Sequence, residues 1–302
     1  MEGIMETNKM ETRDIFPLLM SMSLPMVLSM LVQSLYNIID SIYVSYLGTG
    51  ALTAVSLAFP LQNIVLSVAV GIGVGIASVL SISLGKKDQK RANEAATMGM
   101  ALTLIHCVLF VILGLVITEP FIGLFTKEPE VMKQACDYTY IVLCFSFGSL
   151  LQIAMEKIYQ GIGAMKTTMI LLGAGAMINI ILDPIFIYGL HMGVRGAALA
   201  TIISQGLSCI WILRFLTGKK TRLRLKKSDM HLEKRIVIPC LGLGLGPFVM
   251  QATDALLNIA FNSSLQHYGG DIAVGCMTIS STIQQMVWIP VQGIGQGAQP
   301  II

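Results

Sequence analysis

The chain has 302 residues, of which 54% are hydrophobic and only 12% are charged, and its mean hydropathy is +0.74. Soluble globular domains carry about 25% charged residues, so this composition excludes a water-soluble enzyme or binding domain. The net charge of +3 comes from basic residues that lie mostly in short loops between apolar runs. Membrane topology explains that pattern better than a nucleic-acid partner does.

Residues 1–14 are polar and lack the short apolar core and small-residue cleavage site of a cleaved signal peptide. Long apolar runs follow, and about 20 such residues suffice to cross a bilayer as a helix. The runs predict eight transmembrane helices, at 15–46, 51–84, 93–118, 132–162, 167–190, 196–217, 236–266 and 271–300. The expected fold class is therefore an all-α polytopic membrane protein.

Lysine and arginine are distributed unevenly between the two sides of these helices. On one side lie Lys9, Arg13, Lys86, Lys87, Lys90, Arg91 and Lys166, and the linker 218–235 adds eight more. The loops on the other side hold only Lys127, Lys133 and Arg195. By the positive-inside rule, we expect an inner-membrane protein whose N-terminus and linker are cytoplasmic. The linker is also a candidate for binding anionic lipid headgroups.

An internal repeat relates the first two expected helices to the last two. A shift of 222 positions, the difference between Pro25 and Pro247, also places Gly71, Gly73 and Gly75 on Gly293, Gly295 and Gly297. Six helices separate the copies, so both cross the membrane from the same side, as in a parallel repeat. This predicts a six-helix first lobe at 15–217 and a partial second lobe at 236–302, in a chain truncated before four further helices. The glycines lie inside apolar helices, which favours close helix packing over a phosphate loop.

Asp40 and Asp183 are the clearest ionisable residues inside the expected helices. Such a residue costs about 2.5–3.5 kcal/mol at a helix centre on insertion scales, and it is a functional candidate by default. Both lie about seven residues, or roughly 10 Å, from the same side of the membrane. Asn179 precedes Asp183 by one helical turn and adds an amide oxygen on the same face. Oxygen ligands suit Na⁺ and a desolvated carboxylate can carry a proton, so either coupling ion fits.

The structural alternatives are that Asp40 caps the end of its helix and that Asp183 belongs to an Asp-Pro turn. The repeat places Asp40 on Asn262, and this difference in charge favours an ion-coupling role for the first half. Gln251 and Asp254, one turn apart in the seventh helix, form a candidate second polar site.

Two prolines inside the helices, Pro25 and Pro184, lack an N–H and are expected to bend their helices near the carboxylates. The six cysteines show no CxxC pair and no histidine at ligand spacing. We therefore expect no metal site and no cofactor other than a coupling ion.

Four features carry a resemblance to a known family: Pro25, LYNIIDSIYVSYLG at 35–48, ALTAVSLAFP at 51–60 and PVQGIGQGAQPII at 290–302. They resemble the bacterial branch of the multidrug and toxic compound extrusion (MATE) family, and the resemblance covers the whole chain. It implies twelve helices in two lobes around a central cleft, and antiport of Na⁺ or H⁺ against organic cations. The family's first-lobe ion site would map onto Asp40, Asn179 and Asp183, with Thr201 as a further ligand.

The expected function is secondary active export of lipophilic, often cationic compounds by alternating access between two lobes. A flippase for lipid-linked sugars is an alternative, but it needs basic residues in its central cavity, and we expect no lysine or arginine in the middle of a helix. A non-transporting fragment is a second alternative, because of the expected truncation. A membrane enzyme is disfavoured, since the sequence has no paired acid and nucleophile, no metal-ligand spacing and no nucleotide motif.

Overall fold

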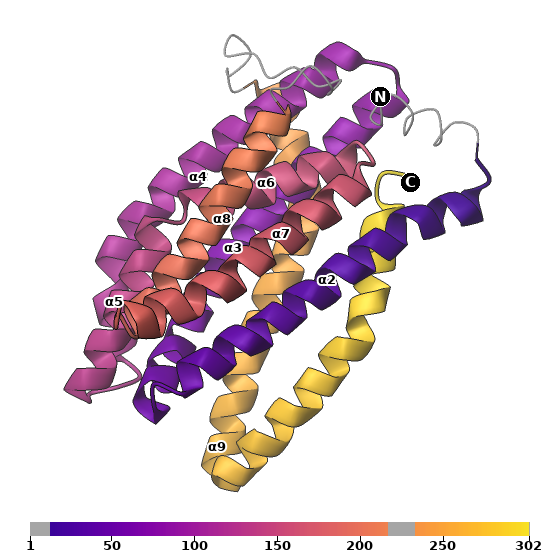
Figure 1. The fold of residues 1–302 in the computed structure, drawn as a ribbon. Coiled ribbons are helices and arrows are strands. Elements are labelled where there is room, and N and C mark those ends of the chain that lie inside the picture. Colours follow the sequence, from indigo (N-terminus) through magenta and orange to yellow (C-terminus); the bar gives the residue numbers. More distant parts are fainter. Residues whose placement is uncertain (1–12, 217–232, 302) are drawn as a thin grey trace.

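The computed structural model describes residues 13–216 and 233–301, and these ranges form a bundle of long helices (Figure 1). In chain order the elements are α2 (Ile15–Ser45), α3 (Thr49–Gly85), α4 (Gln89–Gly123), α5 (Pro129–Cys144), α6 (Phe147–Gly161), α7 (Met165–Pro184), the π-helix η1 (Ile185–Gly189), α8 (Val194–Leu216) and α9 (Lys234–Ala298). Within the described ranges, six helices are long and apolar enough to cross a membrane, or seven if α5 and α6 form one bent span. The predicted fold class is confirmed. Residues 1–12 and the linker residues 217–232 lie outside the described part of the chain.

Successive spans alternate in direction, so each end of the bundle gathers a fixed set of helix termini (Figure 1). One end holds the start of α2, the α3–α4 and α6–α7 junctions and the end of α8. We term it the basic end, because Lys86, Lys87, Lys90, Arg91 and Lys166 all lie there. The α2–α3, α4–α5 and η1–α8 junctions lie at the opposite end.

Helix α9 is continuous over 65 residues, where the sequence predicted two separate helices. A straight helix of this length would extend roughly 100 Å. However, Cys240 near its start lies against Gly75 of α3, and Gln299 just after its end donates a hydrogen bond to Ser78 of α3 at 3.4 Å. The chain must therefore reverse its direction, and Figure 1 shows α9 folding back on itself. We refer to residues 234–257 as its first arm and to residues 281–298 as its second arm.

The predicted helix 132–162 is instead two helices, α5 and α6, that meet at an angle of 49°. At the break, Ser146 Oγ donates a hydrogen bond to the carbonyl oxygen of Leu143 at 2.7 Å. Two residues later Gly148 lies so close to α8 that an added Cβ would come within 2.9 Å of Gly206 Cα. Serine and glycine together commonly mark sharp bends in helices. The prediction of one continuous helix was wrong because these residues let α6 turn toward α8.

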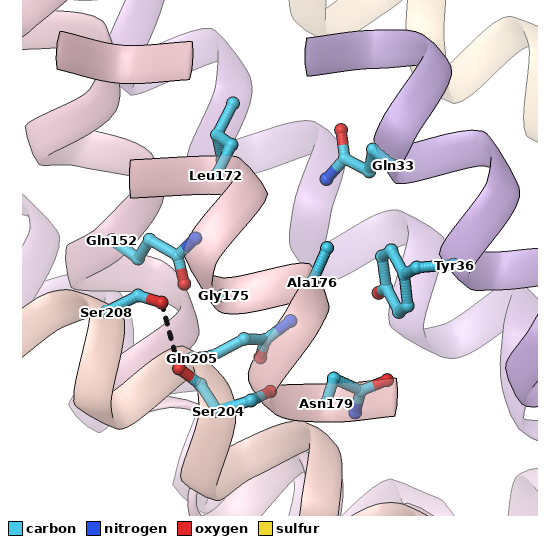
Figure 2. A pocket seen from close by; sticks show the side chains of 10 residues that line it. All are labelled: Gln33, Tyr36, Gln152, Leu172, Gly175, Ala176, Asn179, Ser204, Gln205 and Ser208. Carbon is cyan, nitrogen blue, oxygen red and sulfur yellow. Dashed lines mark hydrogen bonds between the residues drawn. The ribbon is translucent and has the colours of Figure 1, made fainter. Parts of the chain in front are cut away.

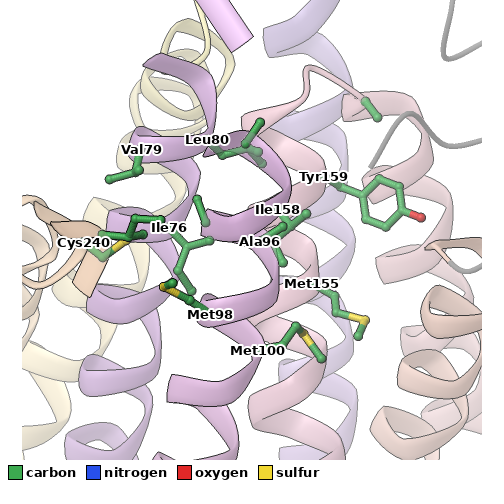
Figure 3. Packing of buried hydrophobic residues seen from close by; sticks show 14 of the residues in the cluster. Ile76, Val79, Leu80, Ala96, Met98, Met100, Met155, Ile158, Tyr159 and Cys240 are labelled. Carbon is green, nitrogen blue, oxygen red and sulfur yellow. The ribbon is translucent and has the colours of Figure 1, made fainter. Parts of the chain in front are cut away.

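The largest apolar cluster lies at the basic end and includes residues from both halves of the chain (Figure 3). Ile76 and Leu80 of α3 and Met155 and Ile158 of α6 pack there with Cys240 of α9. Lipid tails are as apolar as these side chains, so close packing contributes more than removal from water does. The first arm of α9 is thus part of the same core as α3 and α6.

The repeated glycines, apart from Gly295, pack helices closely, as predicted. A Cβ on Gly71 would come within 3.0 Å of the Gly244 carbonyl oxygen on the first arm of α9. On the second arm, a Cβ on Gly293 would come within 2.9 Å of the main-chain nitrogen of Val27 in α2. The two glycine runs therefore join the halves of the chain through two crossings, both in the half of the bundle that contains the basic end.

Candidate functional site

Near the opposite end, α2, α7 and α8 bring four of the predicted polar residues together. Asp40 comes from α2, Asn179 and Asp183 come from α7, and Thr201 comes from α8. The side chain of Asp183 is fully buried, that of Asn179 is 1% exposed and that of Thr201 is 8% exposed, whereas Asp40 is half-buried. We refer to these four residues as the aspartate cluster.

Asn179 connects the members of the aspartate cluster. Its Nδ2 donates to Asp183 Oδ1 and to Thr201 Oγ1, each at 3.4 Å, and an amide nitrogen carries two N–H groups for this purpose. Three buried oxygens, Asn179 Oδ1, Asp40 Oδ1 and Asp183 Oδ2, receive no hydrogen bond from any other residue in the described ranges. Buried polar atoms are normally satisfied, so three of them together indicate a place for a cation or a proton.

The carboxyl groups of Asp40 and Asp183 face each other closely enough to share a hydrogen bond when one of them is protonated. Two ionised carboxylates in this position would repel each other in a low-dielectric environment. A bound cation or a shared proton removes this repulsion, and the donor-free oxygens of the pair and of Asn179 are the ligand type that hard cations prefer.

Two tyrosines that the sequence analysis did not identify lie within electrostatic reach of both aspartates: Tyr36 of α2 and Tyr138 of α5. Tyr36 precedes Asp40 by four residues, so helical spacing alone would have placed it on the same face. Tyr138 comes from a helix distant in the sequence, and no local signal marks it.

Both structural alternatives for the aspartates are wrong. Helix α2 continues past Asp40 to Ser45, so Asp40 is not a cap. Asp183 lies inside α7, which runs through Pro184 into the π-helix η1 rather than into a turn. Tyr188 of η1 donates to the carbonyl oxygen of Tyr43 in α2 at 2.6 Å. π-helical turns are frequent at functional sites, and this one joins α7 to α2 just beyond the aspartate pair.

An ion pair joins α5 to the start of α8 near the aspartate cluster. Arg195 donates from Nε and Nη2 to Asp137 Oδ2, at 2.9 and 2.7 Å. The pair is partly exposed and contributes at most about 1 kcal/mol of stability. Asp137 precedes Tyr138 in the chain, so the pair helps to hold α5, and with it Tyr138, beside α8.

A pocket begins at Asn179 and extends toward the basic end (Figure 2). It is partly open to the surroundings, and its lining is Gln33, Tyr36, Gln152, Leu172, Gly175, Ala176, Asn179, Ser204, Gln205 and Ser208. These side chains are uncharged, and most of them end in an amide or a hydroxyl group. A Cβ on Gly175 would come within 2.5 Å of Ser208 Oγ, so the glycine keeps this space open.

The remaining predicted residues lie elsewhere. Gln251 and Asp254 are on the first arm of α9, where both side chains are exposed. Pro25 is buried in α2, which continues as a helix through it. The side chain of Asn262, the repeat partner of Asp40, lies outside the described residues.

The expectation that no lysine or arginine lies in the middle of a helix did not anticipate Lys157, a buried basic residue near the end of a helix. This residue is in α6 and is only 6% exposed, next to the partly buried Glu156. The sequence contained a signal for it, because Glu156 and Lys157 interrupt an apolar run. Their closeness to the predicted helix end concealed that signal.

Comparisons with known proteins agree with this architecture. Residues 25–185 match the MatE family model. The multidrug export protein MepA of Staphylococcus haemolyticus is 26% identical over 293 residues, which cover 97% of this chain and 65% of the relative. Two solved structures, of a MOP superfamily transporter from Pyrococcus furiosus and of a multidrug resistance MATE transporter in an outward-facing conformation, each match with a TM-score of 0.92, 29% identity and the same coverage. The chain thus spans about 65% of the length of these relatives.

Proposed function

The chain belongs to the MATE family of multi-pass membrane transporters, and we propose that it forms the first lobe and part of the second lobe of an ion-coupled exporter of lipophilic, often cationic compounds. The observation that carries this proposal is the aspartate cluster, where two like-charged groups face each other and three oxygens, one on each carboxyl group and one on Asn179, lack donors. Such a group of atoms needs a positive charge from outside the protein.

Asp40 and Asp183 bind the coupling ion, and Asn179 and Thr201 hold it in place with neutral oxygens. Either Na⁺ or H⁺ satisfies the pair, because each reduces the repulsion between the two carboxylates. Ion binding then draws Asp40 of α2 toward Asp183 of α7. Since Tyr188 already ties η1 to α2 beyond the cluster, this movement changes the spacing of α2 and α7 at the pocket.

The pocket beside the cluster is the place for the exported compound. Its lining combines small apolar groups with amides and hydroxyls, which suits ligands of varied shape. An organic cation there has the ring of Tyr36 and the negative charge of the aspartates within reach. Gln33 and Tyr36 of α2 face Leu172 and Ala176 of α7 across the pocket, so the ion that draws α2 toward α7 narrows it (Figure 2). Ion and substrate therefore compete, and this competition couples import of one to export of the other.

The basic end is cytoplasmic, and the two lobes are closed there and open toward the outside. The positive-inside rule supports the orientation. The inter-lobe contacts of Gly71, Gly75, Gly293 and Gly297 support the closed cytoplasmic end, and so does the similarity to an outward-facing relative. Labelling of engineered cysteines in intact cells tests this orientation: positions near Thr49 and Tyr268 should react with an impermeant reagent. Reaction of the linker 218–235 would overturn it.

A flippase for lipid-linked sugars would use a buried cation to hold a pyrophosphate. Lys157 is such a cation, but its ammonium is bonded to Gln160 and lies near Glu156, and it is not among the residues that line the pocket. Drug export therefore remains the better proposal.

The test of the proposed function is dye efflux from the cytoplasmic side, measured as accumulation of dye inside everted vesicles that contain the protein, with a Na⁺ gradient and a pH gradient imposed separately. At least one gradient should drive efflux by itself, and collapse of both should stop it. Efflux that persists after both gradients are removed would contradict ion-coupled antiport. If the 302-residue chain transports nothing while a longer form that contains it does, the chain alone is a non-transporting part of the exporter.

A further inference from the structure

Three polar side chains near the end of α6 form a buried cluster at the basic end: Glu156, Lys157 and Gln160. The side chains of Glu156 and Lys157 are only 15% and 7% exposed, and their charged atoms are 3.8 Å apart. Charges inside a membrane protein are costly, and a pair this far apart recovers little of that cost. Their retention in an apolar helix calls for a role beyond stability.

The two charges hold the Gln160 amide in one orientation. Lys157 Nζ donates to Gln160 Oε1 at 2.9 Å, and Gln160 Nε2 donates to Glu156 Oε1 at 2.8 Å. A flipped amide would direct its nitrogen at the ammonium and its oxygen at the carboxylate, so only one orientation is compatible with both charges. Bonds of this charge-assisted kind are stronger than neutral ones. The amide is therefore fixed by residues of its own helix.

The second N–H of Gln160 is directed across the boundary between the lobes. It donates to Gln296 Oε1 on the second arm of α9 at 3.3 Å, and Gln296 Nε2 in turn lies 3.9 Å from Met30 Sδ of α2. The close contact of α6 with α3 depends on Gly73, where a Cβ would come within 2.7 Å of Lys157 Cγ. The bond from Gln160 to Gln296 thus joins the two lobes through neutral groups.

We propose that Glu156 and Lys157 are positioning residues that direct Gln160 at Gln296, and that this bond is a latch that keeps the basic end closed. The charged part of the cluster lies within one helix, so it stays intact when the lobes separate. Only the neutral bond breaks, and one such bond contributes about 0.5–1.5 kcal/mol, which suits reversible closure. The role of this bond in transport rests on the proposed alternating access. Whether the bond holds the two lobes together can be tested without measuring transport.

The accessibility of the Cys240 thiol provides a measure of how often the two lobes separate at this boundary. It is 2% exposed and lies against Gly75 in the cluster that both lobes share. When closure is rapid, the rate at which N-ethylmaleimide labels Cys240 is proportional to the fraction of open molecules. The labelling is measured by mass spectrometry of the Cys240 peptide, with the 302-residue chain in lipid vesicles.

Gln296→Ala and Gln160→Ala should each raise the rate of Cys240 labelling about fivefold, the factor expected for loss of one net hydrogen bond. Gln285→Ala is the matched control, because Gln285 is an exposed glutamine of the same helix α9. If both latch variants label Cys240 at the rate of this control, the latch does not exist, whatever the chain transports.

The Lys157→Met variant tests whether Lys157 acts by orienting Gln160 toward Gln296 or only by stabilising the fold. It should raise the labelling rate in the wild-type background but add little in a Gln296→Ala background, because residues that act through one bond are not additive. An equal increase in both backgrounds would show that Lys157 does not act through Gln296, and it would overturn the positioning role. A variant that fails to fold is recognised by labelling of Cys107, which is fully buried within the first lobe.

Discussion

The two ends of the bundle hold buried charge in opposite ways. At the basic end, Glu156 and Lys157 carry opposite charges, and Gln160 is bonded to both. At the opposite end, Asp40 and Asp183 carry the same charge, and oxygens of this pair and of Asn179 lack donors. A balanced cluster can stay buried in every state of the protein, whereas an unbalanced one is complete only with a cation from outside. This contrast supports the proposed ion binding at the opposite end and a structural task at the basic end.

The largest expected effect is that of Asp40→Asn, which should reduce gradient-driven efflux to background without loss of membrane insertion. An amide has nearly the same shape as a carboxylate but neither charge nor an exchangeable acid proton, and Asn262 already stands at the matching position of the repeat. Asp183→Asn should behave alike, and the double variant should be little worse, as expected for one shared site.

Asp88→Asn is the control for both substitutions. Asp88 caps α4 by accepting a hydrogen bond from the main-chain nitrogen of Arg91, a bond that asparagine can also accept. Full gradient-driven efflux by Asp40→Asn at normal expression would show that Asp40 is not part of an ion site. The proposed difference in function between the two ends would then no longer hold.

A smaller effect is expected where the pocket is narrowed and the aspartates are left unchanged. Gly175→Ala places a methyl group against Ser208 and should lower dye efflux about tenfold, the scale of moderate overpacking. Gly173→Ala, one half-turn away, is the matched control, because a Cβ there meets no atom within 4 Å. Equal efflux by the two variants would show that the compound does not use this pocket.

The smallest effect should come from the second half of the chain. Asp254→Asn removes an exposed charge on the first arm of α9 and should lower efflux about twofold, in line with the small energies of exposed charges. Complete loss at unchanged expression would place an essential ion site in the second lobe.

The sequence identified those residues of the proposed ion site whose chemistry differs most from that of their neighbours. Asp40 and Asp183 are recognisable because a carboxylate inside an apolar run is rare, and Asn179 follows from helical spacing. Tyr138 is brought to the site by tertiary packing alone, so no local pattern identifies it. Most of the membrane-spanning helices were recognisable as well, since apolar length is a strong signal.

Features that depend on contacts between helices were not predictable in the same way. The bend between α5 and α6 depends on the approach of Gly148 to Gly206, and the reversal of α9 depends on contacts of its first arm with α3 and of its second arm with α2. The bond from Gln160 to Gln296 was missed because these two residues lie 136 positions apart in the sequence. Each of these features depends on a contact between residues that neither hydropathy nor helical spacing can identify.

The central claim, that Asp40 and Asp183 form the ion site, is tested most directly by ion-dependent thermal stability of the purified 302-residue chain. A ligand that binds only the folded state raises the free energy of unfolding by about 1.4 kcal/mol for each tenfold excess over its dissociation constant. If the ion is Na⁺, the melting temperature at fixed pH should therefore rise with the Na⁺ concentration. If the ion is H⁺, the melting temperature at fixed Na⁺ concentration should rise as the pH is lowered. The account predicts that this rise disappears in the Asp40→Asn, Asp183→Asn double variant and persists in Lys157→Met. An unchanged rise in the double variant would contradict it.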